Sequence, residues 1–163
     1  MIQCFIPCVP PRVNHQRKRI VRVGQWTRLA DAPELVAAKA MLETLLLPHA
    51  PASPLEGPVV LQLEFTWPWL AGDSKRTKAL GRVPHTSRPD CSNVAKTLED
   101  RLVALRFLAD DSQVVDLRVR KWRGESPGIG IVVAPYQPLM LDEVDEVHAH
   151  PSRALFDALE GRA

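Results

Sequence analysis

Alternation of apolar and polar residues predicts the strands of this chain. The clearest case is residues 59–67, where every odd position is apolar and Gln62, Glu64 and Thr66 stand between them. A strand with one buried face shows this period of two. Other segments with the composition of short strands are residues 2–6, 19–23, 115–120 and 128–134. The glycine-containing and proline-containing stretch 124–127 is expected to join the last two as a hairpin.

Two segments carry apolar residues at helical spacing. In the first, Asp31 and Glu34 have the spacing of a capping box that opens a helix ending near Leu47. In the second, Ser92 is the expected cap of a helix over about 93–106. The apolar stripes of the two helices are Leu35, Ala38, Leu42 and Leu45, and Val94, Leu98, Leu102 and Leu105.

Strands and helices in this order predict an α+β fold, a small mixed β-sheet of four or five strands with two packed helices. Residues 48–58 are rich in proline, and residues 70–88 are expected to form a long basic loop. We assign residues 1–136 to one domain and residues 137–163 to an acidic C-terminal tail that can form a short helix over 152–160.

Composition narrows the class of protein. An apolar fraction of 45% is ordinary for a globular domain, and no apolar run approaches the roughly 20 residues that span a bilayer. The N-terminus lacks the pattern of a secretory signal, so we expect a cytoplasmic protein without a membrane partner. Three scattered cysteines are expected to stay reduced, without a metal ion.

The net charge of +2 conceals an uneven distribution, because the tail from residue 137 holds six acidic and two basic residues. Basic residues gather in three groups elsewhere, which suits a polyanion, although solvated faces of an ordinary protein explain them equally well. The groups are Arg17, Lys18, Arg19 and Arg22; Lys75, Arg76, Lys78, Arg82 and Arg88; and Arg118, Arg120, Lys121 and Arg123.

Two aspartates stand at the ends of predicted elements. Asp90 directly precedes the second helix, and Asp111 directly precedes a strand. If helix and sheet pack together, these carboxylates supply the oxygen ligands that a hard divalent cation prefers. Lys96, one turn into the helix, can then face a phosphate. The alternative is that both aspartates serve as cap and turn residues.

The wider motif favours the metal site. Residues 88–96 read Arg-Pro-Asp-Cys-Ser-Asn-Val-Ala-Lys, Glu99-Asp100 follow, and residues 110–116 read Asp-Asp-Ser-Gln-Val-Val-Asp. This run resembles the signature of the RusA family of Holliday-junction resolvases, and the resemblance is strong over residues 88–133. It implies a RusA-like fold and a homodimeric endodeoxyribonuclease that binds four-way DNA junctions. Such an enzyme nicks two strands symmetrically with Mg²⁺, or with Mn²⁺ in its place, in DNA recombination and repair.

The resemblance also implies roles for individual residues. Asp90 and Asp111 match metal-binding carboxylates of the family, and Lys96 matches its catalytic lysine. Asn93 is expected to support the loop backbone, and Asp100 to pair with Lys96 at the i, i+4 spacing. For DNA binding we select Arg17, Lys18, Arg19, Lys75, Arg76, Lys78 and Arg88 from the basic groups.

One position departs from the family, because Ser92 stands where a second aspartate is usual. Serine keeps the capping ability but lacks the charge, so the exchange affects metal binding more than folding. Candidate replacement ligands are Glu99, Asp100, Asp110 and Glu64. Two alternatives therefore stay open: a junction-binding or branched-DNA-binding protein with weakened or lost cleavage, and a nuclease of this fold with another nucleic-acid substrate.

Overall fold

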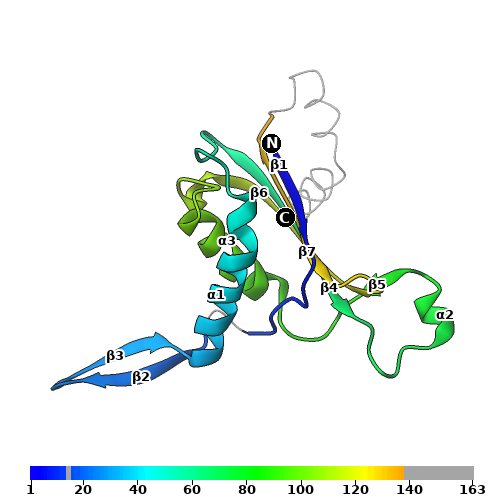
Figure 1. Cartoon of the computed structure of the whole chain (residues 1–163), viewed down its shortest axis with the longest axis horizontal. Coiled ribbons are helices and arrows are strands. Elements are labelled where there is room, and N and C mark those ends of the chain that lie inside the picture. Colours follow the sequence, from blue (N-terminus) through cyan, green and yellow to red (C-terminus); the bar gives the residue numbers. More distant parts are fainter. Residues whose placement is uncertain (14–15, 138–163) are drawn as a thin grey trace, which may run out of the picture.

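The structure is a computed structural model that describes residues 1–13 and 16–137 (Figure 1). Its centre is a five-stranded mixed sheet in the order β1-β7-β4-β6-β5. The strands are β1 Ile2–Ile6, β4 Val59–Pro68, β5 Arg82–Pro84, β6 Val114–Gly124 and β7 Gly128–Pro135. β4 pairs in parallel with β6, and the other neighbours are antiparallel. The predicted α+β class and mixed sheet are confirmed.

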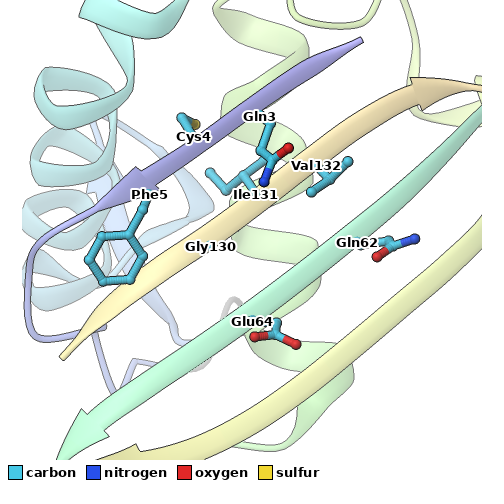
Figure 2. Close-up of a pocket in the computed structure, with 8 residues that line it drawn as sticks. All are labelled: Gln3, Cys4, Phe5, Gln62, Glu64, Gly130, Ile131 and Val132. Atoms are coloured by element: carbon cyan, nitrogen blue, oxygen red, sulfur yellow. The ribbon is translucent and has the colours of Figure 1, made fainter. Parts of the chain in front are cut away.

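β4 lies in the middle of the sheet because it is the most apolar strand. Its five odd-numbered residues are all buried, as the alternation predicts. They pack against two helices on one face of the sheet, α1 Pro33–Leu46 and α3 Cys91–Ala104, through residues such as Leu42 and Leu98. No described helix covers the other face, and Figure 2 looks onto that bare face with the helices behind the sheet.

The expected hairpin over residues 124–127 is wrong, because β6 and β7 lie on opposite sides of β4. The pattern in β6 also misled, since Val115 and Leu117 are 56% and 44% exposed. The β4–β6 register shifts between Val59 and Val60. In addition, β5 pairs only with residues 122–124 of β6. Most of the outer edge of β6 therefore has no neighbouring strand among the described residues.

Both predicted helices form, but their predicted caps are wrong. Helix α1 begins after Ala32 with no side-chain cap, because the Asp31 carboxylate accepts from Lys18 and Lys39. Helix α3 begins after Asp90, so Ser92 lies inside its first turn. The buried residues Leu35, Leu42, Leu98 and Leu102 confirm the predicted stripes.

Helix α3 ends in a Schellman-type turn. The Phe107 amide donates to the Leu102 carbonyl at 2.8 Å, and the Arg106 amide donates to the Val103 carbonyl at 3.0 Å. Arg106 has a φ of 62°, a left-handed conformation that glycine usually supplies at this point of the motif. The turn places Phe107, which is fully buried, beneath the helix.

Sequence patterns missed several short elements. Strands β2 Lys18–Val23 and β3 Trp26–Asp31 form a separate two-stranded sheet, of which only β2 was expected. The expected loop over residues 70–88 contains helix α2 Lys75–Lys78 and strand β5. Of the expected tail, only Gln137 is among the described residues. Within the described part of the chain, no helix is long and apolar enough to cross a membrane, and no disulfide links the cysteines.

Candidate functional site

Helix α3 and the short 3-10 helix η2 Asp111–Gln113 bring three charged residues together. The Lys96 ammonium donates to Asp111 and forms an ion pair with Asp100 at 3.1 Å. The expected i, i+4 pairing of Lys96 with Asp100 is therefore present. All three side chains keep between a third and a half of their surface exposed, so solvent and substrate can reach them.

Electrostatics in this acidic cluster, which we define as Lys96, Glu99, Asp100 and Asp111, favour a bound cation. Hydrogen bonds that Lys96 donates to Asp111 and then to Asp100 raise the pKa of Lys96 well above its usual range, so the ammonium stays charged. Burial raises the pKa of Glu99, against the opposing effect of Lys96, and the carboxylates of Asp111 and Asp100 add smaller increases. The single Lys96 ammonium is paired with two carboxylates, so an additional cation would balance their remaining charge.

Asp90 directly precedes α3, and its side chain is exposed. The Asn93 amide lies 3.5 Å from its carboxylate, at the limit of hydrogen bonding. Lys121 of β6 holds the preceding turn, because its ammonium donates to the carbonyl oxygens of Ser87, at 2.7 Å, and Pro89. Lys121 therefore positions the loop that carries Asp90.

The role of Lys121 was not foreseen, because it depends on the register of β6 against β4. Lys121 is paired in register with Phe65, whose side chain is on the helix-covered face. A lysine at such a position must direct its ammonium toward acceptors, because a buried unpaired charge is costly. Without the register of β6 against β4, this position looks like one more basic surface residue.

A cleft of roughly 400 Å³ opens directly beside Asp90. Three guanidinium groups line it together with the carboxylate and with Asn93. Arginine forks match phosphate oxygens, so this combination suits a phosphate held next to a cation-binding carboxylate. Arg17 and Arg88 were selected from the sequence, whereas Arg12, from the proline-rich loop after β1, was missed.

The donor types fit a hard divalent cation, but the ligand set is incomplete. Asp90 and Asp111 offer carboxylate oxygens, and Ser92, in the first turn of α3, is exposed and uncharged. No group of three or more His, Cys, Asp or Glu residues within the described chain has the spacing to hold a metal ion. In addition, the Asp111 carboxylate already forms an ion pair with Lys96.

Two of the four suggested replacement ligands are committed elsewhere. Glu64 lies on the bare face of the sheet, where it pairs with Arg82 at 3.0 Å and Arg120 at 3.1 Å, so it cannot complete a site on α3 (Figure 2). Asp110 caps η2 by accepting from the Ser112 amide at 2.9 Å, and hydrogen bonds from the Ser112 side chain and then from its amide lower the pKa of Asp110. Glu99 and Asp100 remain the nearest candidates.

A hollow larger than the cleft beside Asp90 lies away from this site. It has a volume of about 650 Å³ and lies on the bare face, lined by residues such as Gln3, Phe5 and Glu64 (Figure 2). Only Glu64 among its lining residues carries a charge. The charged groups around α3, and not the volume of a hollow, therefore indicate where the chemistry of this protein takes place.

The remaining basic residues selected for DNA binding lie at two projections of the molecule (Figure 1). Lys18 and Arg19 belong to the β2–β3 hairpin, where Lys18 pairs with Asp31. Lys75, Arg76 and Lys78 make up most of α2 and are exposed at the opposite end. The cleft with Arg17 and Arg88 lies between, so the basic residues are spread along the molecule.

Comparison with known proteins identifies the class. The family model described as "Endodeoxyribonuclease RusA" matches residues 9–134. The chain belongs to the RusA family of endodeoxyribonucleases.

Two relatives match parts of the chain. It is 34% identical over 92 residues to the "Crossover junction endodeoxyribonuclease rusA" of Lactococcus phage r1t, a match that covers 56% of this chain and 67% of the relative. It is 33% identical over 90 residues to the "Uncharacterized protein YqaN" of Bacillus subtilis (strain 168), which covers 52% of this chain and 63% of YqaN. The match thus spans less than two thirds of the length of YqaN.

Proposed function

We propose that this protein is a cytoplasmic, Mg²⁺-dependent, structure-selective endonuclease that resolves four-way DNA junctions during recombination and repair. One observation carries the proposal: the arginine-lined cleft lies beside Asp90 at the N-terminus of α3, and the acidic cluster follows along the same helix. A phosphodiester needs such a combination, because guanidinium groups bind its oxygens and carboxylates hold the cation that polarises it. Family membership and the phage relative support the same substrate.

The residues of the site divide the work. Arg12, Arg17 and Arg88 hold the phosphate in the cleft. Asp90 and Asp111 hold the divalent ion, Mg²⁺ or Mn²⁺, which when bound activates water and stabilises charge on the phosphate. Lys96 is protonated, so it donates to the phosphate or the leaving oxygen and does not serve as a general base.

We further propose that the active form is a homodimer. A four-way junction has approximate two-fold symmetry, and paired nicks require two sites related by that symmetry. Sedimentation velocity at micromolar concentration tests this, with a dimer as the expected species. A monomer that nicks both strands in concert would contradict it.

A second candidate function is junction binding with weakened or lost cleavage. Two observations favour it: Ser92 carries no charge, and the described residues contain no complete three-ligand group. Incubation of a labelled four-way junction with the protein, with and without Mg²⁺ or Mn²⁺, separates the two functions. We expect metal-dependent nicks. Tight junction binding with no nicks at any metal concentration would establish the second function instead.

A further inference from the structure

The β2–β3 hairpin stands apart from the body of the protein. It forms its own two-stranded sheet and projects away from α1 (Figure 1). Only its base is anchored, by a hydrogen bond of 2.9 Å from the Ala32 amide to the Arg17 carbonyl and by the pairing of Asp31 with Lys39 at 2.7 Å. With six residues in each strand, the ribbon is roughly 20 Å long.

The hairpin exposes apolar side chains that nothing in the described chain covers. Trp26, beside the turn at the tip, is 80% exposed. Ile20 and Leu29 face each other across the strands and are 75% and 71% exposed. By the strand register, Ile20 and Leu29 lie on one face of the ribbon and Trp26 lies on the other. Scattered apolar residues on a surface need no explanation, but exposed ones on both faces of one short ribbon indicate that a partner covers it.

The charges on the hairpin define the partner as an anion. Arg19, Arg22 and Arg28 are exposed, and none of them forms an ion pair with another described residue. Asp31 is the sole acidic residue of the two strands, and it is neutralised by two lysines. Unpaired arginines on a projecting ribbon complement phosphate.

The position of the hairpin favours DNA over other anionic surfaces. Its first strand follows directly after Arg17, which lines the cleft beside Asp90. A strand of DNA seated in that cleft therefore continues toward the base of the hairpin. The major groove of B-DNA, about 12 Å wide, admits a two-stranded β-ribbon.

We propose that the β2–β3 hairpin is a DNA-binding arm that lies in the major groove of one arm of the bound junction. Arg19, Arg22 and Arg28 contact phosphates on the walls of the groove, and Trp26, which shares a face of the ribbon with Arg19 and Arg28, contacts its floor. This inference rests on the proposed function, because it assumes a DNA substrate in the cleft. The contacts are independent of base pairing at the branch point, so a linear duplex makes them too.

Binding measurements on two variants test the arm. Replacing Arg19, Arg22 and Arg28 with glutamine should reduce the slope of log affinity against log salt by about 2.7, from about 0.9 for each lost phosphate contact. Trp26→Ala should weaken binding roughly tenfold, since a largely exposed indole loses its burial against DNA. Trp26→Phe retains an aromatic ring and should keep most of the affinity. All binding is measured without divalent metal, on a four-way junction and on a linear duplex.

Dimethyl sulfate footprinting supplies a readout in the groove itself. The wild type should protect guanine N7 atoms, which face the major groove, and the arginine variant should lose that protection. Leu47→Ala, at an apolar site 62% exposed away from the hairpin, is the matched control and should leave both readouts unchanged. Thermal unfolding of each variant verifies that the fold is retained.

Other results would overturn the arm. If the wild type binds and nicks the junction while the hairpin variants bind with unchanged salt slope and footprint, the arm is wrong and the proposed function stands. If the variants become monomers and otherwise behave as the wild type does, the hairpin is a contact between subunits. If they lose only binding to vesicles of anionic lipid, it is a membrane contact. A wild type that binds no DNA would remove the proposed function, and the arm with it.

Discussion

Two charge clusters of opposite balance lie on the two sides of the sheet. On the helix-covered side, Lys96 sits between Asp100 and Asp111. On the bare side, Glu64 sits between Arg82 and Arg120. The side chains of the first cluster are 34–47% exposed and those of the second 34–59%, so burial does not distinguish them. The two clusters differ instead in the sign of their surplus charge.

The surplus determines what each cluster can bind. Two carboxylates flank the single ammonium of Lys96, so negative charge remains and a cation is favoured there. Positive charge remains around Glu64. This surplus suits a phosphate ligand or an ion pair that holds neighbouring strands together. In the sequence, Glu64 and Asp111 are equally acceptable candidates for a metal ligand. Their ion-pair partners in the structure distinguish them.

The largest expected effect separates the two clusters by neutral substitution. Asp111→Asn should reduce metal-dependent nicking at least about 10²–10³-fold, because an anionic ligand is lost where transition-state charge is stabilised. Glu64→Gln, the matched control, should retain nearly full nicking because Glu64 faces the other side of the sheet. Initial rates across a Mg²⁺ titration measure both. Equal losses in the two variants would refute the distinction.

Removal of the Lys96 ammonium should have the second-largest effect. Lys96→Met should lower nicking about 10²-fold, since a fixed ammonium no longer faces the phosphate. Stability should change by no more than about 1 kcal/mol, because the ion pairs are partly exposed. Arg120→Met provides the control on the bare face. Because the pKa of Lys96 is raised, the wild-type rate should show no loss from Lys96 deprotonation between pH 7 and about pH 10.

Restoring a carboxylate to α3 should have a smaller effect. Ser92→Asp adds an anion to the first turn of the helix, so it should lower the Mg²⁺ requirement several-fold and stabilise the fold by about 0.3–1 kcal/mol. Ser92→Asn is the neutral control of similar size. Metal titrations of nicking and urea unfolding give the two quantities. No gain from Ser92→Asp would indicate that Glu99 or Asp100 already serves as the further ligand.

The smallest effect concerns a third cluster, in which Asp31 lies between Lys18 and Lys39. Hydrogen bonds from Lys18 and then Lys39 lower the pKa of Asp31 to about 2. A depressed carboxyl pKa contributes stability above about pH 4, and this contribution is lost as the pH falls toward 2. Because Lys18 is 43% exposed, solvent screening should keep it to about 1 kcal/mol or less.

Asp31→Asn measures that contribution. In urea unfolding, the wild type should exceed the variant in stability at pH 7, and the difference should shrink on going from pH 4 to pH 2. A difference that stays constant over this range would show that the variant acts through packing and not through the charge of Asp31.

The sequence predicted the central features of the fold because they depend on local periodicity. The alternation in β4 and the stripe of α3 each report one buried face, and both are buried as predicted. Residues 2–6 and 128–134 were also placed correctly as strands. The signature around Asp90 and Asp111 predicts a site at α3, and that assignment stays a prediction; the position of Asp90 directly before the helix is confirmed, since an element end is readable from sequence.

What failed depends on long-range pairing. Asp31 does not cap α1, because two lysines compete for its carboxylate. Leu117 is exposed despite its place in an alternating pattern, because little of the described chain covers the outer edge of β6. The contact of Lys121 with the turn before Asp90 needs the β4–β6 register, which no local pattern contains.

The central claim is that the arginine-lined cleft and the acidic cluster form one metal-dependent junction-cutting site. Its most direct test is the religation of products from a four-way junction that carries a label on each strand. We predict that the wild type with Mg²⁺ produces two symmetrically placed nicks that DNA ligase can seal, and that EDTA or Asp111→Asn prevents them. Nicking that persists unchanged in the Asp111→Asn variant would contradict the claim.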